Sequence, residues 1–342
     1  MRQSVRLAIL LCVSFTLVVS FHPRPSFSAE FTMKCGTPDP PDGSLSVMAS
    51  WAMQEIKKRS NGRIEGKVFP SSQLGNNVQR TEQLQLGTLE CTLGAVAFLS
   101  GAYAPVTMFD LPFIFPDDPD VVRQVVLHGK AARWMLDDMD RVGLKGIAFH
   151  MTGYKHFTTS KVPVAKLEDM QGIKFRAMTS PILLAQFKAL GANAIPIPFA
   201  EVYNALQSGV AEGQENPYWA IHKMRFFEVQ KYLSVSSHGL IVVYILASKH
   251  WWNKLPIDLQ AIIAEVFVEG EAVTWEVNER IDREAVTAMK AAGLRFITLA
   301  PEERERFRQA TANVKQVYIK RLGATGEKLL TMLEADIAAF SK

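Results

Sequence analysis

Apolar positions along the chain recur in two rhythms, as short unbroken runs and as longer segments with helical spacing. The runs Phe31–Gly36 and 241–247 are typical of strands, and the second is strongly β-prone in the manner of a buried strand. Segment 44–60 instead repeats apolar residues every three or four positions, which predicts a helix facing a core. Further strand candidates are 63–69, 90–97, 146–150, 174–178 and 194–197, and further helix candidates are 79–86, 121–136, 181–190 and 201–208. This alternation of strands and helices predicts an α/β fold.

One segment is much longer than the other predicted helices. Residues 257–292 contain no proline and a single glycine, Gly270, while Pro256 stands at the start and Gly293 just past the end. As one helix they would extend about 54 Å at 1.5 Å per residue, which exceeds a single small domain. We therefore expect this helix to run along two lobes, which short crossovers would connect because no flexible linker or internal repeat is visible.

The first 29 residues have the pattern of a secretory signal peptide. Arg2 and Arg6 precede an uncharged apolar run at 7–21, and a polar stretch then ends at Ala29. The alternative is a membrane anchor, but fifteen apolar residues are short for a span, which needs about 20. We expect cleavage near residue 29, export to the periplasm and a mature chain that begins at Glu30.

Composition and charge narrow the functional classes. The chain has 342 residues, of which 48% are hydrophobic and 21% charged, as expected for about two globular domains. Its net charge of +4 includes Arg2, Arg6 and Arg24 of the leader, which contains no acid, so the mature chain carries 35 − 34 = +1. The basic excess therefore belongs mainly to the export signal, and no nucleic-acid partner is expected.

Two cysteines, Cys35 and Cys91, remain after the leader is removed. Both lie in short apolar runs typical of buried strands, which favours two buried thiols on neighbouring strands. A disulfide stays open, because export leads to an oxidising compartment, but it requires Cα atoms within about 4.4–6.8 Å. No Cys-x-x-Cys and no Cys/His cluster with metal-ligand spacing occurs, so neither a metal nor another cofactor is expected.

Common enzyme signatures are missing from the sequence. There is no Gly-x-Ser-x-Gly, His-Glu-x-x-His, Walker loop or Gly-x-Gly-x-x-Gly after a strand. The seven histidines form no His-x-His and no helical i,i+4 pair. The sequence therefore carries no local signature of a common enzyme class.

Seven short strings then indicate a family. They occur in order at 69–75 (FPSSQLG), 110–113 (DLPF), 172–176 (GIKFR), 191–193 (GAN), 198–203 (PFAEVY), 212–217 (EGQENP) and 227–232 (FEVQKY). Together they closely resemble the solute-binding proteins of TRAP (tripartite ATP-independent periplasmic) transporters, DctP type, over essentially the whole mature chain. The resemblance implies two α/β lobes with crossing strands and a long helix spanning both. We place residues 30–152 and 241–281 in lobe I, and residues 153–240 and 282–342 in lobe II.

The resemblance also assigns three ligand contacts. Arg176 matches the arginine that pairs with a substrate carboxylate, and its planar fork suits two parallel hydrogen bonds to one carboxylate. Asn216 matches a ligand-contacting amide and Phe199 an aromatic side chain that packs on the ligand. Without the resemblance, Arg176 would be taken for a surface residue, Asn216 for part of an Asn-Pro turn and Phe199 for a core residue.

Four further candidates depend on a less regular match. Many relatives carry arginine before the string at 157–160, where this chain has Lys155 and His156. Lys155 keeps the positive charge of that arginine but lacks its planar guanidinium. If the alignment is shifted by one residue, His156 takes the position of the arginine instead. Tyr218 and Trp219 follow Asn216-Pro217, where relatives often have smaller residues. They either shape the pocket or, for Trp219, pack between the lobes.

The sequence thus predicts a monomeric periplasmic protein that binds an organic acid between two lobes and delivers it to the membrane permease of a TRAP transporter. Strings 236–239 and 176–181 are most similar to the C4-dicarboxylate branch (succinate, malate, fumarate), although Trp219 would equally suit a larger or aromatic acid. Two alternatives stay open. One is an exported hydrolase with Lys155 or His156 as base, and the other is a sensory binding protein that serves a receptor.

Overall fold

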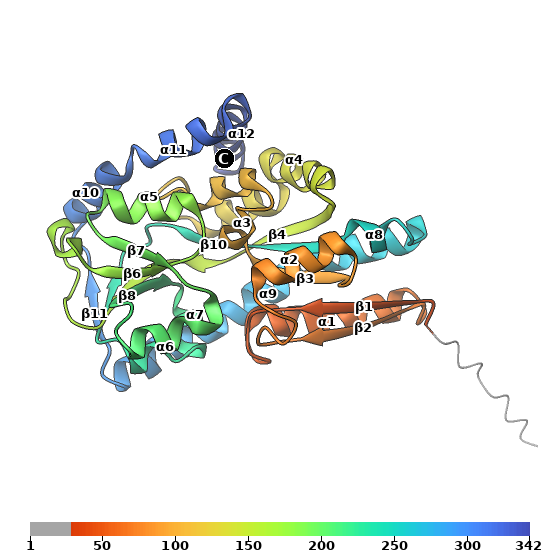
Figure 1. Cartoon of the computed structure of the whole chain (residues 1–342), viewed down its shortest axis with the longest axis horizontal. Helices are drawn as coiled ribbons and strands as arrows, with labels where there is room; N and C mark the ends of the chain where they lie inside the picture. Colours follow the sequence, from red (N-terminus) through yellow and green to blue (C-terminus); the bar gives the residue numbers. More distant parts are fainter. Residues whose placement is uncertain (1–28) are drawn as a thin grey trace, which may run out of the picture.

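Two β-sheets form the centres of two lobes at opposite ends of the molecule (Figure 1). The computed structural model describes residues 29–342, so the predicted signal peptide lies outside the described residues except for Ala29. The first lobe contains a five-stranded sheet and the second lobe a six-stranded sheet, both with helices packed on them. The predicted α/β fold with two lobes is confirmed.

Each sheet mixes parallel and antiparallel neighbours. The first sheet has the order β2 (Ile64–Phe69), β1 (Phe31–Gly36), β3 (Cys91–Ala95), β10 (Leu240–Ser248) and β4 (Leu144–Tyr154). The second has the order β11 (Arg295–Thr298), β9 (Tyr232–Val235), β5 (His156–Thr159), β8 (Gly213–Asn216), β6 (Lys174–Ala177) and β7 (Asn193–Pro196). Strands β1, β2 and β3 are parallel, as are β6, β7 and β8, whereas β10 and β5 run antiparallel to their neighbours in the respective sheets.

Helices cover the sheets and connect their strands. In chain order they are α1 (Ser44–Arg59), α2 (Asn77–Leu86), α3 (Pro119–His128), α4 (Lys130–Asp138), α5 (Pro181–Ala189), α6 (Val202–Gln207), α7 (Tyr218–Lys223), α8 (Lys249–Trp252), α9 (Ile257–Ala291), α10 (Pro301–Thr311), α11 (Val314–Leu322) and α12 (Ala324–Phe340). Short 3₁₀ turns include η1 (Val96–Leu99), η2 (Ala104–Asp110) and η5 (Phe199–Glu201). The expected helix at 121–136 is divided into α3 and α4, because the backbone leaves the helical conformation at Gly129.

Strand β10 shows why the first lobe has a core on both faces of its sheet. All nine of its residues are buried. Val242 and Tyr244 join one apolar cluster while Val243 and Ile245 join the other, as the alternation of side chains along a strand requires. A strand covered on both faces reads as a continuous apolar run, and this is the pattern that the sequence showed at 241–247.

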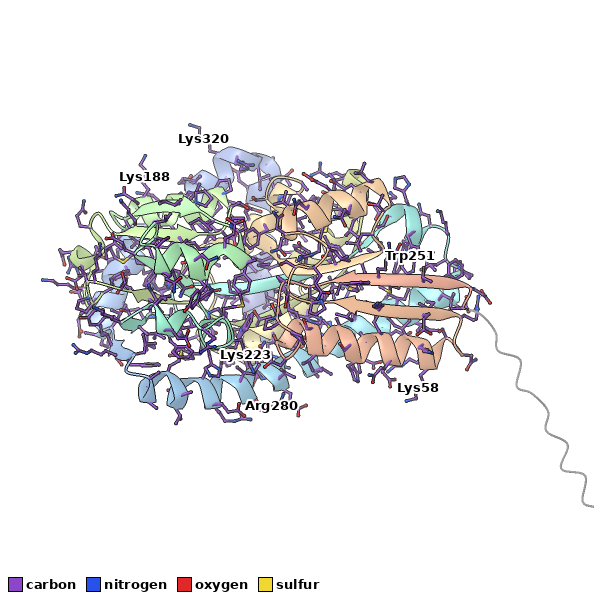
Figure 2. All side chains as sticks on the ribbon, turned by 60° about the horizontal axis from the view of Figure 1, so that its bottom comes forward. Lys58, Lys188, Lys223, Trp251, Arg280 and Lys320 are labelled. Atoms are coloured by element: carbon purple, nitrogen blue, oxygen red, sulfur yellow. A yellow bond between two sulfur atoms is a disulfide. The ribbon has the colours of Figure 1, made fainter. Side chains whose placement is uncertain are left out.

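Two strand crossings, one long helix and the segment from α10 to α12 join the lobes. Strand β4 passes into β5 across Lys155 alone, and β9 passes into β10 across residues 236–239. Helix α9 is continuous over 35 residues, packs on α1 and β4 in the first lobe and on α7 in the second, and runs along both lobes in Figure 2. The predicted single helix is confirmed, and it ends one residue before the expected position.

The end of the chain returns to the first lobe. Phe307 of α10 lies in a core cluster of the second lobe, but Leu329, Leu330 and Leu333 of α12 join the core of the first lobe. Helix α12 packs on α3 and α4 there (Figure 1). The expected division placed all of 282–342 in the second lobe, whereas Val314 and Tyr318 of α11 and the three leucines of α12 pack in the core cluster of the first lobe.

Cys35 and Cys91 are joined by a disulfide. They stand opposite each other on the parallel neighbours β1 and β3, with Cα atoms 4.4 Å apart. The sequence favoured two free thiols; the structure corrects this, because the register brings the two side chains directly together within the range that a disulfide needs. Among residues 29–342, no helix is both long and apolar enough to cross a membrane.

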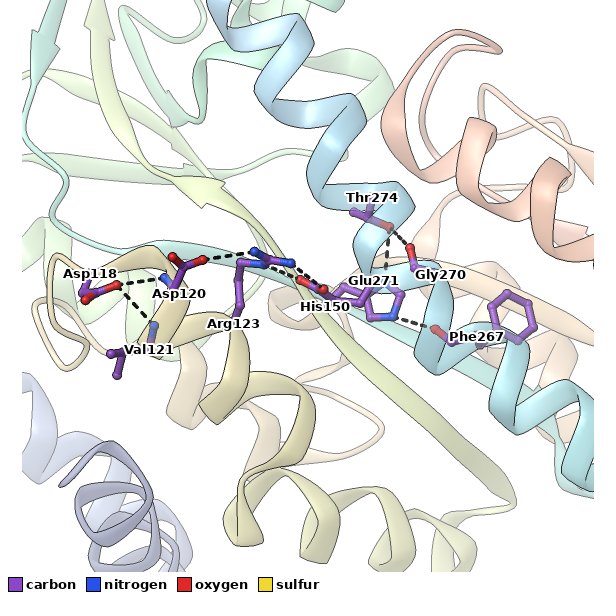
Figure 3. A network of polar contacts seen from close by, with 9 residues as sticks. All are labelled: Asp118, Asp120, Val121, Arg123, His150, Phe267, Gly270, Glu271 and Thr274. Atoms are coloured by element: carbon purple, nitrogen blue, oxygen red, sulfur yellow. Dashed lines mark hydrogen bonds and ion pairs between the residues drawn. The ribbon is translucent and has the colours of Figure 1, made fainter. Parts of the chain in front are cut away.

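Polar contacts hold α9 against the first lobe (Figure 3). The Nε2 atom of His150, on β4, lies 2.8 Å from the carbonyl oxygen of Phe267 in α9, and Nδ1 lies 3.2 Å from the hydroxyl of Thr274. Beside them, Arg123 of α3 donates two hydrogen bonds, of 2.7 and 2.8 Å, to the carboxylate of Glu271. Because a carbonyl oxygen can only accept, Nε2 of His150 carries the hydrogen.

We expect the free energy of unfolding to fall steeply as the pH drops from about 6.5 to about 4. Burial lowers the pKa of His150 to about 4 and that of His156 to about 3, and it also lowers the pKa of His238. These histidines bind protons more weakly in the folded than in the unfolded chain, where the pKa is about 6.5. Their contribution is therefore complete above that value and is lost as the pH falls, by up to about 1.4 kcal/mol per pH unit and group.

Urea titrations at a series of pH values measure this dependence. His150→Gln is expected to reduce the slope of the free energy of unfolding against pH between pH 6.5 and 4, whether or not it changes that free energy at neutral pH. His250→Gln, which changes an exposed histidine, serves as the matched control. If His150→Gln and the wild-type protein showed parallel profiles, the buried neutral imidazole would not be the cause.

Candidate functional site

A small cavity lies between the two lobes. The side chains around it belong to both lobes: Pro38, Asp39, Leu45, Asn77, Ala95, Phe98, Ile241 and Val243 from the first, and Met178, Phe199, Asn216 and Trp219 from the second. Several of them stand at or just beyond the carboxyl ends of β1, β3, β6 and β8. In open α/β sheets ligands bind at this edge, in the crevice that the loops leave outside the carboxyl ends of the strands.

Two polar contacts close the space between the lobes beside the cavity. The hydroxyl of Ser100 in the first lobe donates to the carbonyl oxygen of Thr179 in the second, at 3.1 Å. Lys223 of α7, labelled in Figure 2, lies 2.6 Å from the carboxylate of Asp42 in the first lobe. The two lobes are therefore in direct contact beside the cavity, through one hydrogen bond and one ion pair.

Arg176 is a buried cation next to this cavity. It stands on β6 with a fully buried side chain, and its guanidinium lies 5.8 Å from the ring centre of Phe98 in the cavity wall. Its Nε donates to the carbonyl oxygen of Ile197 at 2.9 Å. Within the described part of the chain, neither terminal nitrogen has a hydrogen-bond partner. Burial lowers the pKa of Arg176 to about 10, which the charge of Glu215 partly opposes, so the group stays a cation at neutral pH.

Three other predicted site residues line the cavity. Asn216 ends β8, and its Nδ2 donates to Oε1 of Gln214. Trp219 is 3% exposed at the start of α7, and its Nε1 has no hydrogen-bond partner among residues 29–342. Phe199 in η5 contributes an aromatic face. The structure therefore brings Asn216, Phe199 and Trp219 together near Arg176, although they come from separate loops.

Lys155 lies behind the cavity in an ion pair. Its Nζ is 2.6 Å from Oε1 of Glu215, and both side chains are fully buried. The other carboxylate oxygen of Glu215 accepts from Gln186 at 2.9 Å and lies 2.7 Å from Nε2 of His238. Burial would raise the pKa of Glu215, but Lys155 and His238 outweigh it and hold this pKa well below its usual range. The charge of Lys155 is thus already compensated within the second lobe.

His156 and Tyr218 meet each other beside a different cavity. Their rings stack with centres 4.3 Å apart. Both line a space of ≈ 660 Å³ under the strand crossings, together with Asn278 and Asp282 of α9. The structure therefore separates these two predicted site residues from Asn216, Phe199 and Trp219.

Sequence reasoning missed the side chains that the first lobe contributes. Asp39 follows β1 and accepts a hydrogen bond from the backbone N–H of Leu45 at 3.1 Å. Burial raises the pKa of its carboxyl group to about 7, against the lowering effects of Leu45 and of the charge on Arg80. Asn77 begins α2, and Phe98 lies in η1. The rule that ligands bind at the carboxyl ends of strands would have pointed to Asp39, which follows β1.

The arrangement suits a small organic anion. Its walls are mainly apolar or aromatic, and its cation is buried with two nitrogens free to donate. A buried guanidinium with two free nitrogens is stabilised most by a carboxylate, because a carboxylate accepts two parallel hydrogen bonds from it. In the described residues no group of three or more His, Cys, Asp or Glu side chains could hold a metal ion.

Comparisons with known proteins cover most of the chain. The family model described as bacterial extracellular solute-binding protein, family 7 (DctP), matches residues 46–321. The C4-dicarboxylate-binding periplasmic protein DctP of Vibrio cholerae is 30% identical over 339 residues, which cover 98% of this chain and 97% of the relative.

Two solved structures have the same fold. A TRAP periplasmic solute-binding protein from Desulfovibrio salexigens with bound orotic acid is 37% identical with a TM-score of 0.87, covering 90% of this chain and 99% of the other. A TRAP periplasmic solute-binding protein from Sulfurospirillum deleyianum with bound succinate is 31% identical with a TM-score of 0.82, covering 90% and 99%.

Proposed function

The chain belongs to the bacterial extracellular solute-binding proteins of family 7, the DctP family, and we propose that it captures a small organic acid between its lobes for a TRAP transporter. The observation that carries this proposal is Arg176, a buried guanidinium with two terminal nitrogens that no described residue accepts from, beside an apolar cavity.

The energetics of Arg176 favour a carboxylate as its partner. A buried charge is costly unless it is paired and hydrogen-bonded, and no described residue accepts from the terminal nitrogens of Arg176. A ligand carboxylate supplies both missing acceptors and is itself compensated. An analogue without the carboxylate leaves the guanidinium unpaired, which is a strong source of selectivity.

Binding is coupled to lobe closure because the cavity walls come from both lobes. Phe98 and Asp39 belong to the first lobe, and Trp219 and Asn216 belong to the second. A ligand that contacts both walls only in the closed arrangement shifts the population toward closure. The short crossings at Lys155 and at 236–239 are the segments about which the lobes move.

C4-dicarboxylates are the first ligand class to test, because the Vibrio relative is named for them and the Sulfurospirillum structure holds succinate. Orotate is the second, because it occupies the structure from Desulfovibrio. Both classes share the carboxylate that Arg176 requires.

Location and partner follow from the family and the sequence. We propose that segment 1–29 directs export, that the mature protein works in the periplasm, and that the closed, loaded form docks on membrane permease subunits. A permease that recognises closed lobes would accept loaded protein in preference to empty protein, since ligand binding favours closure.

A thermal-shift screen of purified protein tests ligand capture. Succinate, malate, fumarate and orotate are compared with their uncharged carboxamides. At 100 times its Kd a ligand stabilises the folded protein by about 2.7 kcal/mol, so at least one acid is expected to raise the Tm while its amide does not. Equal shifts with acid and amide, or none with any organic acid, would count against carboxylate capture. NMR of the incubated acid should show it unchanged, and a product would favour an enzyme instead.

A further inference from the structure

Asp39 brings a carboxyl group to the same cavity from the opposite lobe. Its side chain is 1% exposed and lines the cavity together with Phe98 and Trp219. The hydrogen bond that the described residues give its carboxylate runs from Leu45 N–H to Oδ2. The side chain lines the cavity, so its second oxygen, Oδ1, can accept from a ligand there.

The other buried cations near the cavity are already engaged. Lys155 is paired with Glu215. Arg80 donates from Nε to Thr92 at 2.8 Å, and its terminal nitrogens donate to Gly75, Asn77 and Leu93 at 2.6, 2.9 and 3.1 Å. Arg176 differs from both, because its terminal nitrogens have no acceptor in the described chain. At a pH above about 7, where Asp39 is ionised, a second ionised carboxylate on a ligand would therefore face it without a free cation to compensate the charge.

We propose that Asp39 is a specificity-determining residue that accepts a hydrogen bond from an N–H or O–H group of the bound acid, across the cavity from Arg176. The ligand class is then a small acid with one carboxylate for Arg176 and a hydrogen-bond donor at its other end. This inference rests on the proposed function, because it presupposes that Arg176 holds the carboxylate.

The walls between the two polar ends favour a flat ligand body. Phe98, Phe199 and Trp219 surround the space with aromatic rings, and Met178 adds an adaptable apolar side chain. Orotate combines a carboxylate, a planar ring and ring N–H donors, and it is the ligand of the related structure from Desulfovibrio. Succinate has a second carboxylate in place of a donor, so it serves as the contrasting probe.

Asp39→Asn isolates this role. The amide oxygen of asparagine can still accept from Leu45 N–H, while the second atom of the group changes from an acceptor to a donor. Calorimetric titration with orotate and succinate is performed on the wild type, on Asp39→Asn, and on Asp118→Asn as control. Asp118 also caps a helix start, at α3, and is outside the cavity lining.

The wild type is expected to bind orotate at least about tenfold more tightly than succinate, in line with the selectivity of a buried charged hydrogen bond. Asp39→Asn should lower orotate affinity about tenfold or more and leave succinate affinity unchanged or higher, so that the preference collapses or inverts. Asp118→Asn should bind both acids like the wild type. As a measurement independent of mutant folding, wild-type protein should lose affinity for at least one of the two N-methyl derivatives of orotate.

The outcomes separate this inference from the proposed function. Tighter binding of succinate than orotate by the wild type, or unchanged orotate affinity in Asp39→Asn, would overturn the role of Asp39 while leaving carboxylate capture intact. Wild-type affinity for both N-methyl derivatives would overturn it as well. If the wild type bound none of the acids tested here or in the thermal-shift screen, the proposed function itself would fail.

Discussion

Arg176→Met is expected to abolish acid binding while leaving the melting temperature of the ligand-free protein unchanged or higher. The guanidinium is buried without acceptors for its terminal nitrogens, and burial lowers the pKa of Arg176 to about 10. Folding therefore carries the cost of an unpaired charge, which methionine removes at similar side-chain length. The hydrogen bond to Ile197 is lost in exchange.

The expected loss of affinity is large. Removing one partner of a buried, hydrogen-bonded charge pair costs about 2–5 kcal/mol, which corresponds to roughly 30- to 4,000-fold in Kd. Calorimetry gives the affinity and differential scanning gives the Tm. Near-normal affinity in Arg176→Met would place the essential cation elsewhere in the molecule.

Arg80→Met is the matched control for stability. Both arginines are fully buried, but the guanidinium of Arg80 donates to Thr92, Gly75, Asn77 and Leu93 within the first lobe. Its removal leaves those acceptors unpaired and should lower the Tm clearly. The two substitutions should thus have different effects: Arg176→Met should lower ligand affinity, and Arg80→Met should lower stability.

Lys155→Met is expected to be among the most destabilising single substitutions in the second lobe. It leaves Glu215 buried without its cation, and breaking a buried ion pair from one side costs about 3–5 kcal/mol. Because the pair holds the pKa of Glu215 down, its contribution is present above the unfolded-state pKa of about 4.3 and is lost as the pH falls. Urea denaturation at pH 7 measures the loss.

Two further variants test the cause of that loss. Lys155→Met combined with Glu215→Gln removes both charges and should recover much of the stability. Lys161→Met breaks the exposed pair with Glu212 and should cost less than about 1 kcal/mol. Equal costs for Lys155→Met and Lys161→Met would contradict a buried, tightly coupled pair.

Much of the fold follows from local sequence pattern. Pro256 and Gly293 delimit α9 almost to the residue, and the apolar run at 241–247 marks a strand buried on both faces. The short strands β5 and β9 carry four residues each and have too little pattern to be recognised. The packing of α12 on the first lobe could not be predicted from sequence either, because it depends on contacts with α3 and α4, which lie far away along the chain.

The site residues, too, could be predicted where a local motif marks them and not where distant contacts decide their position. Motif resemblance led to Arg176, Asn216 and Phe199, which the structure brings to one cavity or next to it. The position of Lys155 could not be predicted, because its partner Glu215 lies 60 residues away in sequence. Asp39 was missed because its position after β1 marks only one edge of a cavity whose other walls come from the second lobe.

The central claim is that Arg176 recognises the carboxylate of a captured acid. The most direct measurement is a calorimetric cycle in which wild-type protein and Arg176→Met are each titrated with the strongest-binding acid of the screen and with its primary carboxamide. We predict that the wild type prefers the acid by about 30-fold or more and that Arg176→Met binds both weakly with no preference. An undiminished preference for the acid in Arg176→Met would contradict the claim.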